Sequence, residues 1–282
     1  MKIKISGDST IDAPAELIGK YGVGILPLTI VLSGADRRDG ADCSPDDIRE
    51  CVEAGGTSST SAVSIGEYLD YFGALLGEYD AVIHICISSA MSICYQNAVA
   101  AADGLPVHVI DSKNLSSSGS LLVIEAARLA EDGTAPEEIA AALREYAAKI
   151  DASFVISTLK YLAKGGRCSA VAALGANLLK LKPCIEVDAA AGTMGVGKKY
   201  RGALEPALMQ YVSDRLAGRG DVDAAKPIFI TRSLGVTDET VAAVRGKILE
   251  FQPFQTILTS MAGCTIFNHC GPGTLGILFS RK

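Results

Sequence analysis

The stretch Ala81–Ala98 constrains the fold of this 282-residue chain more than any other segment. It begins as a continuous apolar run, AVIHICI, which is typical of a strand buried on both faces of a parallel sheet. Ser88, Ser89 and Ser92 then interrupt the run, and a helical pattern follows. In open α/β sheets such a strand-to-helix turn lies at the carboxyl ends of the strands, where ligands bind. The N–H groups of the first helical turn favour an anion there, although serine is also an ordinary helix cap.

Hydroxyl-bearing turns recur along the first half of the chain. Asp8, Ser9 and Thr10 follow a short strand predicted over residues 2–6. The segment GGTSSTS, which ends at Ser61, precedes a helix whose start carries the capping-box pair Ser64 and Glu67. A third, serine-rich turn follows a buried strand predicted over residues 107–110. We expect these turns to bring uncharged donors together at one edge of the sheet.

The pattern of elements changes near residue 150. Before it, short strands alternate with helices such as the one predicted over Gly119–Glu131. After it, Lys182–Asp188 and Thr193–Lys199 are predicted to form an antiparallel hairpin. We therefore predict an α/β protein of two domains. Residues 1–150 would form a domain with a parallel, Rossmann-like sheet, and residues 151–282 a smaller α+β domain.

Residues 25–45 are predicted to hold one strand and one loop. The strand covers Ile25–Leu32, and Pro27 indicates either an edge strand or a position at the start of the strand, because proline cannot donate to a ladder. A polar loop over Asp36–Gly40 is predicted to follow. It leads to a helix with Ser44 as its cap and Pro45 at its first position.

Composition excludes several classes of function. The net charge of −6, without any concentration of Lys and Arg, argues against a nucleic-acid surface. No run of 18 apolar residues predicts a transmembrane segment, and the start MKIKISGDST lacks the apolar region of a signal peptide. We therefore expect a soluble, cytoplasmic protein. The eight cysteines include no C-x-x-C, and only three histidines accompany them, so we expect no metal site.

The three histidines differ in their surroundings. His84 and His108 lie in apolar strands and are predicted to be core residues. His269 precedes a Gly-Pro-Gly bend in a predicted loop, where it could orient a carboxylate or pass a proton. A serine with this histidine would suit a serine hydrolase, but the chain has no G-x-S-x-G elbow and no acid close to His269. It also lacks both common glycine-rich nucleotide motifs.

Several segments, taken in order, resemble motifs of the DegV family of bacterial lipid-binding proteins. Asp8-Ser9 is similar to the family's opening motif, and the segment from Thr60 to Ser64 to its T-S-x-P-S. The decapeptide ISSAMSICYQ, which contains Ser92, is similar to I-S-S-x-L-S-G-T-Y-Q. Further similarities are DSK at 111–113, LAKGGRCS at 162–169, KP at 182–183 and HCGPG at 269–273. The resemblance covers nearly the whole chain.

The resemblance implies a two-domain α/β protein that holds one long-chain fatty acid in a tunnel between its domains. It implies that Thr60 and Ser92 receive the carboxylate, with Ser61 and His269 beside them. The best-understood members of the family serve as the acyl-carrying subunit of bacterial fatty acid kinase, and the resemblance implies the same role here. A separate kinase phosphorylates the bound carboxylate with ATP, so the chain itself would be no enzyme and would need no cofactor. Arg167 and Arg201 would face that kinase by analogy.

Four further residues are expected to lie next to the carboxylate-binding residues and to support them without binding the carboxylate directly: Asp8, Ser9, Ser89 and Ser116. The chain departs from the family pattern at two places. Ile93-Cys94 replaces the usual Gly-Thr after the binding serine, which removes a hydroxyl and adds bulk. Val63 replaces the usual proline of T-S-x-P-S. Two alternatives stay open: a stand-alone binder of another amphiphile, and a serine hydrolase.

Overall fold

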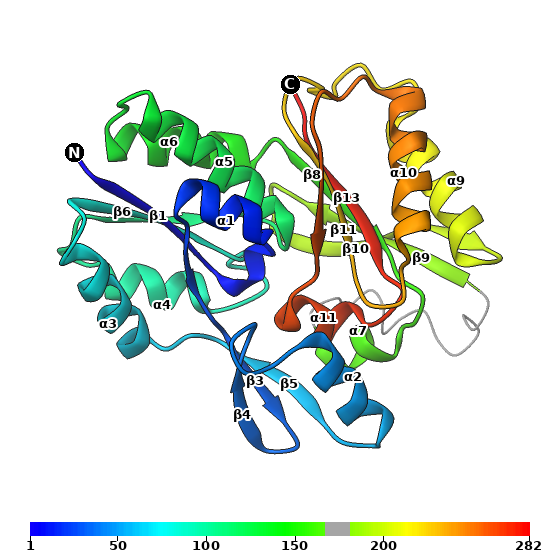
Figure 1. Ribbon diagram of the computed structural model, residues 1–282, viewed down its shortest axis with the longest axis horizontal. Coiled ribbons are helices and arrows are strands. Elements are labelled where there is room, and N and C mark those ends of the chain that lie inside the picture. The colour runs from blue at the N-terminus through cyan, green and yellow to red at the C-terminus, as the bar shows by residue number, and fades with distance from the viewer. Residues whose placement is uncertain (167–180) are drawn as a thin grey trace.

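The computed structural model describes residues 1–166 and 181–282, which form an α/β protein with a parallel N-terminal sheet and a mixed C-terminal sheet. The N-terminal sheet has the order β2-β1-β6-β7, and each neighbouring pair is parallel. Its strands are β1 (Ile3–Asp8), β2 (Gly24–Leu26), β6 (Ala81–Cys86) and β7 (Val107–Asp111). Helices lie on both faces of this sheet (Figure 1). They are α1 (Ala15–Tyr21), α3 (Ile65–Leu76), α4 (Cys94–Ala101), α5 (Ser117–Glu131) and α6 (Pro136–Ala147), and the short 3-10 helix η1 (Ser9–Ile11) follows β1.

The central strand β6 is buried along its whole length, as the apolar run predicts. Successive side chains alternate between the two faces. Ile83 and Ile85 pack in the core with residues of α5 and α6. Val82 and Cys86 pack with residues of α3 and α4 on the other side. Because both faces are covered, the strand contains no polar position apart from His84.

The C-terminal sheet has the order β10-β9-β8-β13-β11-β12. Every neighbouring pair is antiparallel except β11 and β12. Its strands are β8 (Ile150–Val155), β9 (Leu181–Asp188), β10 (Thr193–Arg201), β11 (Ile228–Arg232), β12 (Ile257–Met261) and β13 (Leu275–Ser280). The hairpin predicted for residues 182–199 is confirmed as β9 and β10. Helices α9 (Leu204–Leu216) and α10 (Asp238–Phe251) pack together on this sheet.

Helix α5 packs against both large sheets. Leu121 and Leu122 share one buried core with Ile83 of the N-terminal sheet and with Phe229 and Leu278 of the C-terminal sheet. The change of sheet occurs at β8, close to the predicted division at residue 150. The division of the chain into domains at that residue stays a prediction.

A third, antiparallel sheet lies below the other two in Figure 1. It contains β3 (Thr29–Leu32), β4 (Ala35–Arg38) and β5 (Ser58–Ser61), with α2 (Pro45–Glu53) beside it. The predicted single strand over 25–32 is therefore wrong, because β2 and β3 belong to different sheets and Pro27 lies between them. The predicted polar loop is also wrong, since its first residues form β4. All four β4 side chains are exposed, so the strand shows no apolar alternation.

Two of the histidines lie in the N-terminal sheet. His84 is fully buried, its Nδ1 lies 2.9 Å from Ser6 Oγ, and burial lowers its pKa to about 3. It is a neutral core residue, as predicted. His108 is different, because its side chain is 22% exposed and its Nε2 lies 3.6 Å from the Glu137 carboxylate. The core prediction is wrong for His108, which lies on the edge strand β7.

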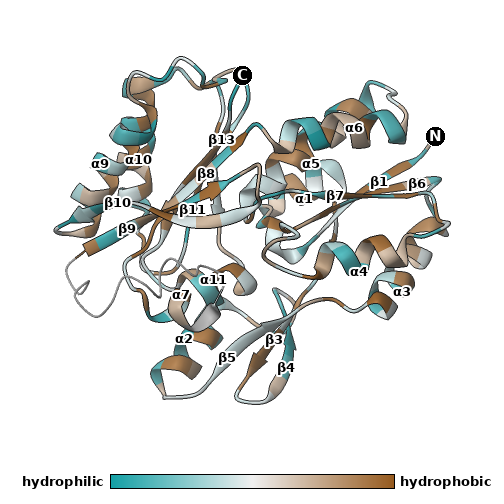
Figure 2. Ribbon diagram, turned by 180° about the vertical axis from the view of Figure 1, so that it is seen from behind, coloured by the Kyte–Doolittle hydropathy of each residue, from teal (hydrophilic) through white to brown (hydrophobic). Residues whose placement is uncertain are grey.

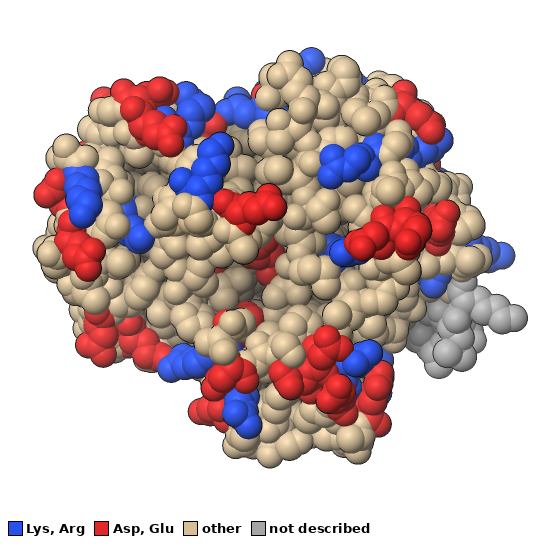
Figure 3. Space-filling view, in the orientation of Figure 1, with Lys and Arg blue, Asp and Glu red and all other residues tan. Residues whose placement is uncertain are grey.

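Within the described residues, no helix is long and apolar enough to cross a membrane. On the face shown in Figure 3, Lys and Arg side chains are interspersed with Asp and Glu and do not form a basic patch. The seven cysteines of residues 1–166 and 181–282 are free thiols. No group of three or more His, Cys, Asp or Glu in these ranges is placed to hold a metal ion.

Candidate functional site

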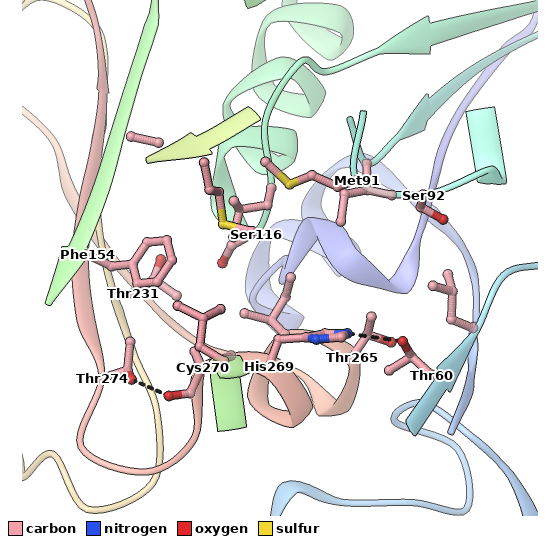
Figure 4. A pocket seen from close by; sticks show the side chains of 18 of the residues that line it. Thr60, Met91, Ser92, Ser116, Phe154, Thr231, Thr265, His269, Cys270 and Thr274 are labelled. Atoms are coloured by element: carbon pink, nitrogen blue, oxygen red, sulfur yellow. Dashed lines mark hydrogen bonds between the residues drawn. The ribbon is translucent and has the colours of Figure 1, made fainter. Parts of the chain in front are cut away.

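A cavity of about 490 Å³ lies where the three sheets meet, and both halves of the chain line it. Its volume falls within the range of about 300–1,000 Å³ that is usual for small-molecule sites. Much of the lining is apolar and includes Ile87, Met91, Leu115, Phe154, Ile266 and Leu278. A polar group of lining residues comprises Thr60, Ser61, Ser92, Asn97, Thr265 and His269. Figure 4 shows Thr60 and Ser92 on the side of the cavity away from Phe154. The cavity therefore has one side rich in hydroxyl groups and a largely apolar remainder, in which Ser116, Thr231, Arg232, Ser233 and Thr274 are polar residues.

Thr60 and His269 meet across 209 residues of sequence. Thr60 lies on β5, and its Oγ1 is 3.1 Å from His269 Nε2 (Figure 4). Strand β5 is pale beside the hydrophobic central strands in Figure 2, because serine and threonine fill it. The structure thus brings two sequence-predicted site residues into hydrogen-bond distance.

His269 lies in the last turn of helix α11 (Cys264–Cys270), so the predicted loop is wrong at this position. The helix ends at Gly271, whose φ of 70° suits glycine. A Cβ on Gly271 would also lie 2.5 Å from the Tyr161 ring. Tyr161 belongs to α7 (Lys160–Gly165), which packs against α11. A helix of seven residues is too short to show a reliable periodicity in sequence.

Ser92 lines the cavity from the turn between β6 and α4. Its Oγ accepts the backbone N–H of Cys94 at 3.2 Å, so the serine also supports the start of α4. Ile93 lies at the rim and is 59% exposed, whereas Cys94 is fully buried in the core of α3 and α4. Burial raises the pKa of Cys94 to about 11. The side chain that replaces the usual threonine therefore packs in the core as a neutral thiol.

The other predicted residues lie in two positions relative to the cavity. Ser61 and Ser116 line it, and the Ser116 hydroxyl donates to the carboxylate of Asp12. Asp8, Ser9 and Ser89 do not line it.

These three residues hold the surrounding turns. Asp8 Oδ2 accepts the Ile87 N–H at 3.0 Å, which fixes the residue that follows β6. Burial raises the pKa of Asp8 to about 6. Ser9 Oγ accepts the Leu28 N–H at 3.1 Å and donates to Asp39 at 2.8 Å. The Ser89 N–H donates to Asp111 Oδ1 at 3.1 Å.

Two carboxylates that sequence reasoning missed hold the start of α11. Asp39 Oδ1 accepts the Cys264 N–H at 2.8 Å, and its Oδ2 accepts the Thr265 N–H at 3.0 Å. Asp12 Oδ1 accepts the Gly263 N–H at 2.8 Å. Burial, with smaller contributions from the charges of Asp39 and Asp8, raises the pKa of Asp12 well above its usual value. No local signal could have found these contacts, because the partners are more than 220 residues apart.

Among the described residues, no Lys or Arg belongs to the polar group formed by Thr60, Ser61, Ser92, Asn97, Thr265 and His269. Among the described lining residues, Arg232 is the one Lys or Arg, and its guanidinium donates to Asp238 at 2.6 Å and to the Val236 carbonyl at 3.1 Å. Arg201 is exposed at the end of β10. Arg167 lies outside the described residues.

Sequence and structure comparisons place the whole chain with known relatives. A protein-family model described as uncharacterised protein, DegV family, matches residues 2–282. A DegV domain-containing protein of Caldanaerobacter subterraneus is 32% identical over 286 residues, covering 100% of this chain and 99% of the relative. A fatty acid-binding protein of Thermotoga maritima is 29% identical, covering 98% and 96%. A structure reporting fatty acid binding of a DegV family protein from Thermus thermophilus has a TM-score of 0.85 and 30% identity, covering 99% and 100%. These matches confirm the predicted resemblance, and the chain belongs to the DegV family.

Proposed function

We propose that this protein binds one long-chain fatty acid in the 490 Å³ cavity, with the carboxylate at the polar side and the alkyl chain among the apolar residues. The observation that carries this proposal is that Thr60, Ser92 and His269, from three separate elements, line one cavity whose other walls are largely apolar, with Thr60 and His269 in hydrogen-bond distance. Relatives described as fatty acid-binding proteins support the same ligand class.

Different lining residues would bind the alkyl chain and the carboxylate of the ligand. About fourteen buried methylenes contribute on the order of 11 kcal/mol at about 0.8 kcal/mol each, before the cost of association is subtracted. A carboxylate buried without partners costs several kcal/mol, so donors are needed where it lies. Thr60, Ser61 and Ser92 can supply them as neutral hydroxyls. The alkyl chain therefore provides most of the affinity, and the hydroxyls fix the direction of the ligand.

The neutral donors suit a ligand whose carboxylate must react. A close Lys or Arg would stabilise the carboxylate strongly and lower its reactivity toward a phosphoryl group. We therefore propose that this chain is the acyl-carrying subunit of a fatty acid kinase and is not itself the enzyme. The partner kinase would bring ATP and metal in the cytoplasm, and it would phosphorylate the presented carboxylate to an acyl phosphate. In this proposal Arg201, with Arg167, contacts the kinase.

Organic extraction of the purified protein, followed by mass spectrometry, tests the ligand class. We expect long-chain fatty acid at up to one molecule per chain. A different lipid would overturn the proposal in favour of another amphiphile. Hydrolysis of a generic ester, abolished by Ser92→Ala, would instead support a serine hydrolase.

Removing either hydroxyl is expected to weaken fatty acid binding. Thr60→Val and Ser92→Ala should each raise the Kd for palmitate at least about 10-fold, since a hydrogen bond to a charged group contributes about 1.5–3 kcal/mol. Displacement of a fluorescent fatty acid measures the effect. Ser59→Ala is the matched control, because Ser59 is exposed on the same strand and does not line the cavity. Unchanged affinity in both cavity variants would contradict the assigned head-group position.

Arg201→Ala is expected to separate binding from phosphorylation. Arg201 is exposed and does not line the cavity, so the palmitate Kd should stay within about 2-fold of wild type. Acyl phosphate formation by the cognate kinase should fall about 10-fold, because one ion pair across a protein interface is lost. Arg245→Ala, an exposed arginine on α10, serves as the control. Loss of palmitate binding in Arg201→Ala would show that the assigned role is wrong.

A further inference from the structure

Thr265 is a buried cavity residue whose hydroxyl makes no hydrogen bond to any described residue. The residue is the second of α11, lines the cavity and is only 4% exposed. Within the described part of the chain, its Oγ1 is buried and has no partner. Buried hydroxyls are paired in most proteins, so an unpaired one calls for an explanation. The unpaired hydroxyl is consistent with a partner that is a bound molecule.

The usual partner of a helical threonine is missing here. Such a hydroxyl normally donates to the carbonyl three or four residues earlier in the helix. Thr265 lies too close to the start of α11 for a full turn of helix to precede it. Its backbone N–H is already bound to Asp39 at 3.0 Å. The backbone of Thr265 is therefore held in place, while its hydroxyl has no partner among residues 1–166 and 181–282.

The position of Thr265 matches that of the proposed head-group residues. Thr265 and His269 are four residues apart on α11, so they share one face of the helix. Figure 4 shows Thr265 beside the hydrogen bond between Thr60 and His269. A carboxylate has about four positions at which it accepts hydrogen bonds. Thr60, Ser92 and His269 would occupy three of them.

We propose that the Thr265 hydroxyl donates a hydrogen bond to the ligand carboxylate and so completes the head-group site. This inference rests on the proposed fatty acid function. In it, Asp39 is a positioning residue, because it holds the N-terminal end of the helix that presents Thr265 and His269. The site then consists of hydroxyls from β5, from the turn after β6 and from α11.

Thr265→Val tests the inference, because valine keeps the shape of threonine and removes only the hydroxyl. The Kd for palmitate should rise about 5- to 10-fold, whereas the Kd for methyl palmitate, which carries no charge, should change less than 2-fold. The Tm of the lipid-free protein should not fall, since the lost hydroxyl had no partner. Thr265→Ser should restore palmitate binding to within about 2-fold of wild type.

Thr240→Val is the matched control. Thr240 is also a buried threonine in the first turn of a helix, but its Oγ1 lies 3.3 Å from Thr237 Oγ1 and it does not line the cavity. This variant should lower the Tm and leave the palmitate Kd unchanged. A fall in Tm for Thr265→Val, with equal losses for palmitate and its ester, would overturn the inference and indicate a purely structural role.

The two proposals fail in different ways. If wild-type protein binds neither palmitate nor any other fatty acid, the proposed function is wrong. If wild-type protein binds palmitate and Thr60→Val weakens binding while Thr265→Val does not, only the role of Thr265 is wrong.

Discussion

Asp39→Ala is expected to lower the Tm by about 8 °C. The buried Asp39 carboxylate accepts hydrogen bonds from the Ser9 hydroxyl and from the N–H groups of Cys264 and Thr265. Its loss leaves buried donors without partners and removes the cap of α11, at a cost of about 3 kcal/mol after relief of charge repulsion with Asp8 and Asp12. Each kcal/mol lowers the Tm by about 2–4 °C in a chain of this size. Differential scanning calorimetry of the lipid-free protein measures the change.

Asp36→Ala is the control for this prediction. Asp36 lies in β4, three residues from Asp39, and is exposed. Its replacement should change the Tm by less than about 2 °C, as is usual for surface positions. The Tm of Asp39→Asn, which keeps one acceptor oxygen, should lie between the Tm values of Asp39→Ala and Asp36→Ala. An Asp39→Ala protein as stable as Asp36→Ala would show that these hydrogen bonds do not hold α11.

The same substitution should also weaken fatty acid binding. Asp39 reaches the site only through α11, whose last turn carries His269. When the first turn loses its cap, the imidazole is held less firmly beside Thr60. Asp39 thus affects both the stability of α11 and the geometry of the head-group site, although it does not itself line the cavity.

The elements that could be predicted from sequence are those whose burial or caps leave a local signal. The strand β6 is buried on both faces and gives a continuous apolar run. The start of α3 is marked by the capping box of Ser64 and Glu67, and both of its hydrogen bonds are present. The last strand, β13, is fully buried and matches the predicted range Leu275–Ser280. By contrast, β4 is exposed on every side chain and α11 is seven residues long, so neither shows a period.

The residues of the candidate site could likewise be predicted only where the sequence carries a local signal or a family motif. Ser92 lies in the turn that follows the recognisable strand β6, and general α/β topology points to that turn. Family motifs point to Thr60, and both a family motif and the Gly-Pro-Gly bend point to His269, but neither signal shows that the two residues touch. Asp39 and Thr265 have no such motif. Their roles depend on contacts between residues more than 200 positions apart, and only the folded chain brings these together.

Met91→Trp is expected to shorten the fatty acid that the protein accepts. Met91 lines the cavity and packs with Leu115 and Ile266, and Figure 4 shows its side chain within the lining. A tryptophan would fill space equal to about three methylenes, and at about 0.8 kcal/mol each the loss is about 2.4 kcal/mol, or roughly 60-fold in Kd. The Kd should rise by this factor for acids of sixteen or more carbons. For acids about three carbons shorter, the Kd should equal that of wild type.

The wild-type chain contains no tryptophan, so the new indole also provides a fluorescence signal from within the cavity. Displacement assays with saturated acids of ten to eighteen carbons give the length preference of each variant. Met209→Trp is the matched control, because Met209 packs against the core around α9 and does not line the cavity. Filling an empty cavity adds packing contacts, so lipid-free Met91→Trp should be at least as stable as wild type. An unchanged length preference, with an indole that does not respond to palmitate, would show that the alkyl chain does not pass Met91.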